Sequence, residues 1–246
     1  MTEIASHRGG ALLWPENSRT AFENTAKLPV EQVELDVHPS RDGKLVVIHD
    51  ATLERTTEGA GPVCEKSFAE LARLKLKGTA ADHILSVEEV AEIFRPTPIK
   101  LRIEIKAGPD RRPYPGLPAK LVAALRDQRM LERSILTSFQ LDTVCEAALG
   151  RPSLHVWLIT PNLQIDVGFS SICEVARSRR VPMVGIRQDW LEASLVDQAR
   201  ACGLAIGGWA ANDEAAIASL LRLGVDVFTT DRPDLALAAR AQMSRG

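Results

Sequence analysis

The chain lacks the features that would place it in a membrane or on nucleic acid. No apolar run among its 246 residues is long enough to span a bilayer, and the N-terminal stretch MTEIASHRGG has neither the basic region nor the apolar core of a signal peptide. The formal net charge is only −2, which gives no electrostatic case for binding nucleic acid. We therefore expect a cytoplasmic protein with no stable membrane anchor and no nucleic-acid partner. The sequence does not indicate its oligomeric state.

Cysteine is also scarce. The four cysteines, at positions 64, 145, 173 and 202, form no CxxC pair and have no histidine beside them. Scattered cysteines of this kind are typical of reduced, structural thiols in the cytosol. The pattern therefore argues against a soft-metal site built on thiolates.

What the chain does have is a regular alternation of short strands and helices. With 45% hydrophobic residues it is long enough for one sizeable core. The strands expected from the apolar pattern are 4–7, 34–38, 45–49, 101–106, 134–138, 154–159, 183–186, 205–209 and 225–229. The helices expected between and after them are 19–28, 87–94, 117–130, 141–149, 170–179, 193–202, 214–223 and a last one from Pro233. Such alternation predicts parallel βαβ units.

The stretch ELDVHPSRDGKLVVIHD, residues 34–50, explains why there are nine expected strands and not the eight of a (β/α)8 barrel. Asp42-Gly43 predicts a two-residue hairpin, because a tight turn between twisted strands needs positive φ. A two-residue turn joins only antiparallel strands, so residues 45–49 form an extra arm. The same turn is expected to set Asp36 opposite His49, on a face shared with His38. We predict an α/β fold, a single TIM (β/α)8 barrel over residues 1–246 with this hairpin arm and a small insertion at about 51–100.

Polar residues gather at the predicted C-terminal ends of the strands, where the chemistry of such barrels is found. These residues are His7, Arg8, Glu34, Asp36, Glu104, Lys106, Trp209, Asn212, Thr229, Thr230 and Asp231, with His49 on the hairpin arm. The three carboxylates of Glu34, Asp36 and Glu104 suit a hard divalent cation, Mg²⁺ or Ca²⁺. The expected cofactor is therefore one such ion.

The cations and histidines complete this constellation. Arg8 and Lys106 beside a metal ion form a natural site for a phosphate group. His7 and His49 have the chemistry of a general acid–base pair, although a lone histidine is more often structural. The sequence does not say which of the two is the base.

Other interpretations stay open for several of these residues. The carboxylates also fit a buried salt-bridge network with Arg8 and Lys106. His38 is expected at the rim of the site in preference to acting as a ligand. Trp209 belongs either to the barrel core or to the pocket wall, and its place at a strand end favours the wall. Asp231 is expected to cap the helix that begins at Pro233.

Several short motifs carry a family resemblance over nearly the whole chain. In order they are HRG (7–9), PEN (15–17), ELDV (34–37), DG (42–43), HD (49–50), EIK (104–106), SF (138–139), GGWAAN (207–212) and TTD (229–231). This ordered set resembles the glycerophosphodiester phosphodiesterase family. The resemblance implies a TIM barrel with a small insertion after the second strand. It also implies metal ligands at Glu34, Asp36 and Glu104, an acid–base pair at His7 and His49, and phosphate contacts at Arg8 and Lys106.

The departures from the family pattern are modest. Ser18 and Ser40 stand where threonine is usual, and His38 where glutamine is common. Ala-Ala follows Trp209 in place of Thr-Val. These changes leave the chemistry intact and concern the wall of the substrate site.

The expected function is metal-dependent hydrolysis of small-molecule glycerophosphodiesters to an alcohol and glycerol 3-phosphate. The alternatives are a lysophospholipase-D-like or other phosphodiesterase, and a non-catalytic barrel that binds a phosphorylated ligand. In the expected mechanism the hydroxyl next to the phosphorylated carbon attacks phosphorus, because an internal nucleophile has a very high effective molarity. The sequence does not identify the alcohol, nor does it distinguish Mg²⁺ from Ca²⁺.

Overall fold

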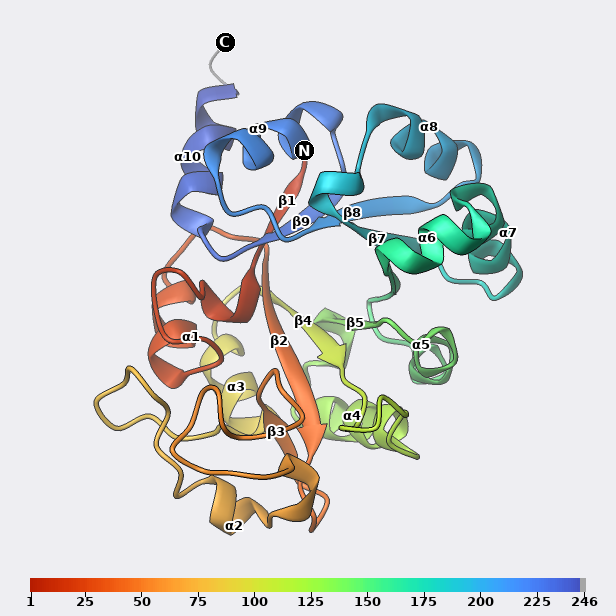
Figure 1. Ribbon diagram of the computed structural model, residues 1–246. Coiled ribbons are helices and arrows are strands. Elements are labelled where there is room, and N and C mark those ends of the chain that lie inside the picture. The colour runs from red at the N-terminus through yellow and green to blue at the C-terminus, as the bar shows by residue number, and fades with distance from the viewer. Residues whose placement is uncertain (244–246) are drawn as a thin grey trace.

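The strands of the computed structural model, which describes residues 1–243, form a closed ring (Figure 1). Eight are mutually parallel, and the first also pairs with the second. In ring order they are β1 (Glu3–Ser6), β2 (Gln32–Pro39), β4 (Lys100–Ile105), β5 (Ser134–Ser138), β6 (Leu154–Ile159), β7 (Met183–Arg187), β8 (Ala205–Trp209) and β9 (Val227–Thr230). The TIM-barrel prediction is therefore confirmed.

Helices surround the ring and follow the strands in the expected order. The α-helices are α1 (Arg19–Thr25), α2 (Phe68–Leu71), α3 (Val87–Phe94), α4 (Leu117–Asp127), α5 (Leu141–Ala148), α6 (Pro161–Val167), α7 (Phe169–Ser178), α8 (Ala193–Ala201), α9 (Glu214–Leu223) and α10 (Pro233–Met243). Short 3-10 turns are η1 (His7–Gly9), η2 (Val63–Glu65), η3 (Leu131–Arg133) and η4 (Gln188–Trp190). The pattern missed α6. No helix within residues 1–243 combines the length and apolar character needed to cross a bilayer.

The strand β3 (Leu45–Val47) lies outside the ring and pairs antiparallel with β2, as an extra arm. The register expected for this hairpin is wrong by one residue, because Val37 and not Asp36 faces the same side as Val47. The turn holds three residues instead of two: the N–H of Ser40 donates to the carbonyl of Lys44 at 2.8 Å, and Gly43 has a φ of 81°. A three-residue turn with glycine in the left-handed region shifts the pairing by one position.

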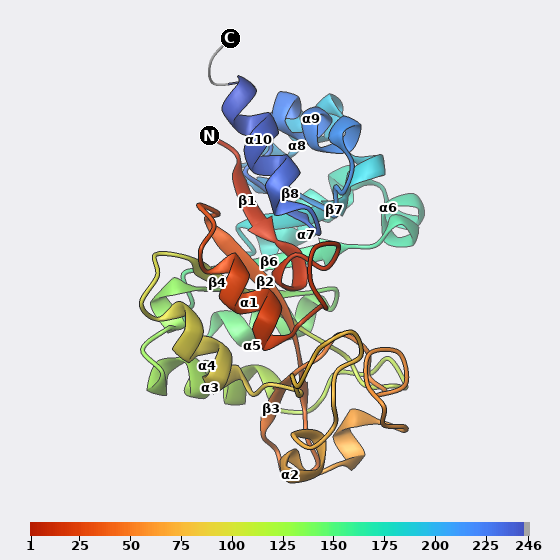
Figure 2. The same cartoon turned by 90° about the vertical axis from the view of Figure 1, so that its left-hand side faces the viewer.

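The segment between β3 and α3 forms a lobe of its own at the end of the molecule away from α10 (Figure 2). It has a separate small core made of Val46, Ile48, Leu53, Val63, Leu71, Leu76 and Ile84. Helix α3 instead packs in the outer layer of the barrel, and its N-terminus has a capping box between Ser86 and Glu89. We therefore propose that the insertion spans 48–86 in place of 51–100.

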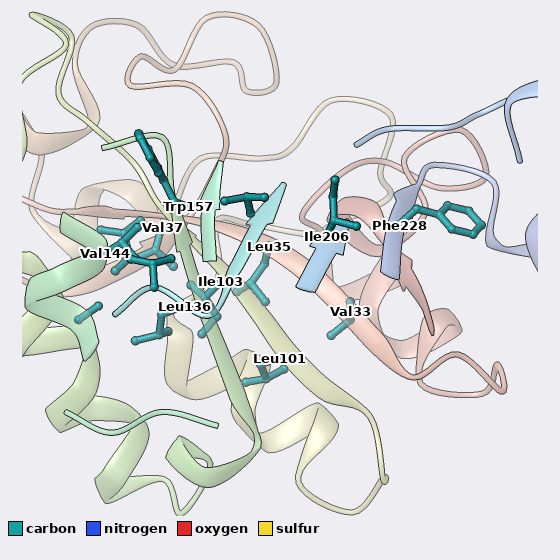
Figure 3. Packing of buried hydrophobic residues seen from close by; sticks show 14 of the residues in the cluster. Val33, Leu35, Val37, Leu101, Ile103, Leu136, Val144, Trp157, Ile206 and Phe228 are labelled. Atoms are coloured by element: carbon teal, nitrogen blue, oxygen red, sulfur yellow. The ribbon is translucent and has the colours of Figure 1, made fainter. Parts of the chain in front are cut away.

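Successive side chains on each strand point alternately to the helices outside and to the inside of the barrel. Leu35, Ile103 and Leu136 lie in the layer between strands and helices, part of which Figure 3 shows. The intervening residues on β2 and β4, such as Glu34 and Glu104, face the barrel interior with the period of two. The sequence pattern of an apolar outer face and a polar inner face thus directs carboxylates into the barrel.

Two glycines keep part of the interior open. A Cβ atom at Gly207 would lie 2.9 Å from the carbonyl oxygen of Val227, and one at Gly185 would lie 2.8 Å from a methyl group of Leu158. The backbone contact leaves no room for a side chain at position 207, and at position 185 the side chain of Leu158 would have to shift. Both glycines line the cavity described next.

Candidate active site

A cavity of about 530 Å³ opens at the C-terminal ends of the barrel strands. Eight residues were expected to act as metal ligands, acid or base, phosphate contacts or pocket wall, and seven of them line it: His7, Arg8, Glu34, His49, Glu104, Lys106 and Trp209. The eighth, Asp36, lies behind them and is fully buried. The fold thus brings together residues that are up to about 200 positions apart in the chain.

The three carboxylates form one cluster. Asp36 on β2 is directly across from Glu104 on β4, and Glu34, two residues before Asp36, lies on the same inner face. Oxygen atoms of all three lie within 4.8 Å of one another. Burial and the nearby Asp36 charge raise the pKa of Glu34 to about 7. This excess of negative charge, offered by oxygen atoms alone, fits a hard divalent cation such as Mg²⁺ or Ca²⁺.

Two basic side chains contact this cluster. Lys106 Nζ is 2.7 Å from Glu104 Oε1 and 3.0 Å from Asp36 Oδ1, and Arg8 Nε is 3.4 Å from Asp36 Oδ2. Burial works against ionisation of Asp36, but these two cations outweigh it and hold its pKa well below the usual range. Both cations also line the cavity, so they can contact an anionic ligand held there.

His7 is placed by a sharp turn at the end of β1. Arg8, Gly9 and Gly10 all have positive φ, at 49°, 79° and 89°, and turn the chain away from the barrel axis. A Cβ atom on Gly9 would lie 2.8 Å from Ala21 Cβ on α1, so the close approach of turn and helix also favours glycine. The HRG motif therefore has a structural reason for its glycine.

The His7 ring is oriented by a carboxylate from the last strand. His7 Nδ1 lies 2.6 Å from Asp231 Oδ1, and its Nε2 lies 3.8 Å from Glu34 Oε2. Burial opposes protonation of His7, but the charge of Glu34 and the hydrogen bond to Asp231 outweigh it and raise its pKa. Because Nδ1 donates to Asp231, Nε2 is the nitrogen available to a ligand.

The expectation that Asp231 caps the last helix is wrong. Its second oxygen accepts from Asn212 Nδ2 at 2.6 Å, and its backbone N–H donates to Asn212 Oδ1 at 2.8 Å. Both carboxylate oxygens are thus used by His7 and Asn212. The sequence placed Asn212 and Asp231 at strand ends but did not connect them to the histidine.

His49 is oriented in the same way as His7, by a carboxylate on Nδ1. Its Nδ1 lies 2.6 Å from Asp50 Oδ1, and Asp50 Oδ2 accepts from Arg55 Nε at 2.6 Å. The hydrogen bond from Arg55 lowers the pKa of Asp50 to about 2, so this carboxylate stays ionised. Each candidate catalytic histidine therefore has a carboxylate on Nδ1.

Arg55, from the insertion, links the two halves of the site. Besides Asp50, it donates to both oxygens of Glu16, at 2.6 Å and 2.8 Å. Glu16 in turn accepts from Arg8 Nη1 at 3.1 Å. Asn17 next to it has a φ of 54° and donates to Asp36 Oδ2 at 3.0 Å. The PEN motif is visible in the sequence, but these roles are not, because they depend on contacts between distant segments.

The expectation that His38 lies at the rim is wrong, because only 1% of it is exposed. Its Nε2 lies 3.1 Å from the carbonyl oxygen of His49, and its Nδ1 lies 3.1 Å from the hydroxyl of Tyr114. A carbonyl only accepts, so Nε2 carries the proton and Nδ1 accepts from the tyrosine. Burial lowers the pKa of His38 to about 4 and keeps it neutral. It supports the backbone of His49 from beneath.

The remaining wall is partly aromatic. Trp209 packs edge-to-face on Phe139 with ring centroids 5.4 Å apart, and both residues line the cavity. The floor includes Arg102, two residues before Glu104 on the same face, whose guanidinium has its pKa lowered to about 10 by burial. Residues two apart on a strand face the same side, so the spacing to Glu104 would have predicted that Arg102 faces the barrel interior. This residue was not among those expected in the site.

Comparisons with known proteins agree with this geometry. The sequence model of the Glycerophosphoryl diester phosphodiesterase family matches residues 7–235. A glycerophosphodiester phosphodiesterase from Bacillus altitudinis is 30% identical over 251 residues, which cover 99% of this chain and 100% of the relative. A crystal structure from Agrobacterium tumefaciens, provisionally named a glycerophosphoryl diester phosphodiesterase, is 36% identical with a TM-score of 0.98 and full coverage of both chains.

A more distant structure shares the fold. An Oleispira antarctica phosphodiesterase, crystallised with the product sn-glycerol-3-phosphate, is 22% identical with a TM-score of 0.82 and covers 98% of this chain and 97% of its own. The match of the family sequence model extends from His7 in the first turn to helix α10, and so includes every residue of the candidate site. This chain therefore belongs to the glycerophosphoryl diester phosphodiesterase family.

Proposed function

We propose that this protein hydrolyses glycerophosphodiesters to an alcohol and glycerol 3-phosphate with the help of one divalent cation. The observation that carries the proposal is the pair of histidines, each with a carboxylate at 2.6 Å from Nδ1, on the wall of one cavity. Membership of the family supports the same reaction. A barrel that only binds a phosphorylated ligand has no need for two histidines oriented in this way.

Glu34, Asp36 and Glu104 are the residues that would hold the cation. A bound divalent ion would supply charge for the phosphate and lower the pKa of a hydroxyl beside it. Lys106 lies between Asp36 and Glu104 and also faces the cavity, so its ammonium can contact a phosphate oxygen. Arg8 can add a second contact from the end of β1, on the other side of β2 from Lys106.

The histidines would move the protons. The hydroxyl on the carbon next to the phosphorylated one attacks phosphorus, His7 takes the proton of that hydroxyl through Nε2, and His49 gives a proton to the leaving alcohol. The product is a five-membered cyclic phosphate. Water then opens the ring with the roles reversed, so that both histidines return to their starting protonation states and glycerol 3-phosphate is released.

A panel of glycerophosphodiesters tests the proposed reaction. Protein stripped with EDTA is assayed without metal, with Mg²⁺ and with Ca²⁺, and glycerol 3-phosphate is detected with a coupled dehydrogenase. We expect product only when metal is added. Lysolipids are followed by release of their alcohol, because their phosphate product stays acylated and is not glycerol 3-phosphate. Cleavage of lysolipids but not of the water-soluble diesters would favour the lysophospholipase-D-like alternative, and no cleavage of any diester would contradict the proposal.

A deoxy analogue tests the internal nucleophile. A diester in which the neighbouring hydroxyl is replaced by hydrogen should bind as a competitive inhibitor without being cleaved. Turnover of the analogue at a rate comparable to that of the parent diester would mean that water attacks phosphorus directly.

A further inference from the structure

A second cavity adjoins the first at the candidate phosphate-binding residues. It has a volume of about 750 Å³ and lies between the start of the insertion and the loop that joins β4 to α4. It shares His49, Glu104, Lys106 and Phe139 with the first cavity. His7 and Arg8 line only the first. The two histidines are therefore not equivalent: one faces a single cavity, and the other lies at the junction of both.

This difference between the two histidines indicates which half of a diester lies in which cavity. In displacement at phosphorus, the attacking and leaving oxygens lie roughly in line on opposite sides of the phosphorus atom. With phosphate at Lys106, the glycerol half lies with His7 in the first cavity and the alcohol half lies beyond His49. We propose, on the basis of the function proposed above, that the second cavity binds the leaving alcohol and that Arg111 selects its chemistry.

The outer wall of the second cavity is a fixed loop. The N–H of Gly108 donates to the carbonyl of Arg112, and the N–H of Arg111 to the carbonyl of Gly108, each at 2.8 Å. Gln140 Nε2 on the next strand–helix junction donates to the carbonyl of Arg111 at 2.9 Å. These bonds hold Arg111 in the left-handed region, with a φ of 64°. The position of this residue on the cavity wall is therefore built into the loop.

The charges of this wall favour one class of alcohol. Among residues 1–243, Asp50 is already held by His49 and Arg55, and Glu104 by Lys106. Arg111 is an exposed residue of the cavity lining, and its guanidinium makes no hydrogen bond or ion pair within the same residues, whereas the neighbouring Arg112 pairs with Asp110 at 3.8 Å. The wall thus offers a free cation and no free carboxylate. It suits an alcohol with oxygen acceptors, such as serine or glycerol, better than one with a quaternary ammonium such as choline.

The test compares headgroups. kcat/KM is measured for glycerophosphoserine, glycerophosphoglycerol and glycerophosphocholine with the metal-loaded wild type, Arg111→Asn and Arg111→Lys. Asparagine removes the charge and tolerates positive φ, and lysine keeps the charge. We expect the serine-to-choline ratio of the wild type to be at least about ten, since a hydrogen bond to a charged group is worth about that factor. The ratio should fall by about tenfold in Arg111→Asn and be largely kept in Arg111→Lys.

Arg112→Asn is the matched control, because its side chain is exposed and lies outside the second cavity. It should keep the wild-type ratio. A wild type that cleaves the choline diester as well as the serine diester would overturn the inference, and so would an unchanged ratio in Arg111→Asn. Both of those results leave the proposed function standing. A wild type that cleaves none of the three diesters would overturn the proposed function and this inference together.

Discussion

Asp231 and His7 are separated by 224 positions in the sequence, yet a hydrogen bond of 2.6 Å joins them. The closure of the barrel explains this, because β9 pairs with β1 and brings the end of the last strand beside the end of the first. The candidate base in the first turn is therefore oriented by a carboxylate from the final strand. Asp50 orients His49 in the same way, since its carboxylate accepts from His49 Nδ1 and leaves Nε2 available, although these two residues are neighbours in sequence.

Asp231→Asn should slow the reaction with little loss of fold. An asparagine amide can donate to Nδ1 and so favour the wrong tautomer of His7, and in a catalytic triad such a change costs up to about 10⁴-fold in kcat. We expect a loss of at least about tenfold in kcat with a smaller change in KM. The control is Asp234→Asn, which removes a surface partner of Arg232 only. Equal rates for the two variants would contradict the role assigned to Asp231.

Arg55→Gln should lower kcat, because Arg55 holds both Asp50, which orients His49, and Glu16, which contacts Arg8. The guanidinium holds two carboxylates at once, and glutamine cannot make these bidentate contacts. We expect a loss of at least about tenfold in kcat and only partial recovery in Arg55→Lys, because a lysine lacks the planar fork. Arg41→Gln, which removes a surface ion pair with Glu70, serves as the control. Full recovery by lysine would show that only charge matters here.

Much of the fold was predictable, because the bounds of strands and helices depend mainly on residues close together in the sequence. The bounds of β5, β6, β8, α3 and α9 agree with the pattern residue by residue. Alternating apolar residues fix which face of a strand is buried, and this also predicted the inward-facing Glu34 and Glu104. The hairpin register failed for a local reason, since Asp42-Gly43 also fits a three-residue turn with only Gly43 at positive φ.

The supporting contacts of the site were not predictable from local pattern. Glu16 meets Arg55 across 39 positions, and Asn17 meets Asp36 across 19. Such contacts depend on how loops from different strand ends converge, which neither periodicity nor spacing encodes. The spacing of two residues predicted which face of the strand His38 lies on. It did not predict that Tyr114 packs over the ring and buries it, and His38 was therefore expected at the rim.

Glu104→Gln should weaken metal binding without unfolding the protein. The substitution keeps the shape of the side chain and removes one of the three proposed negative ligands, and Lys106 still pairs with Asp36. We expect at least about a tenfold rise in the Kd for Mn²⁺ measured by electron paramagnetic resonance, because even the loss of a group that only hydrogen-bonds to a metal ligand costs about 10- to 100-fold. This readout does not depend on turnover. Glu92→Gln, remote from the cluster, is the control, and an identical Kd for the two variants would remove Glu104 from the ligand set.

His38 should make the protein less stable in mild acid. Its folded pKa is about 4 and its unfolded value about 6.5, so the unfolded state binds more protons between these values. The free energy of unfolding therefore falls as the pH drops through this window. The loss is up to roughly 3 kcal/mol, at about 1.4 kcal/mol per pKa unit. Urea unfolding of wild type and His38→Gln in EDTA, at pH 7 and pH 4.5, measures the difference. We expect the variant to lose less stability on acidification, and equal losses would contradict a buried neutral His38.

The measurement that tests the account most directly is the effect of the leaving group on the two histidine variants. Metal-loaded wild type, His7→Asn and His49→Asn are assayed on a glycerophosphodiester of serine and on one of p-nitrophenol, a leaving group that needs no proton. Both variants should be slower than wild type on the serine diester by at least about a hundredfold. When release of p-nitrophenolate is followed in a single turnover, so that only the first step is measured, His49→Asn should recover most of the rate on the p-nitrophenyl diester, and His7→Asn should not. Wild-type rates in both variants on both substrates would contradict the proposed catalytic pair, and recovery by His7→Asn alone would reverse the assignment of acid and base.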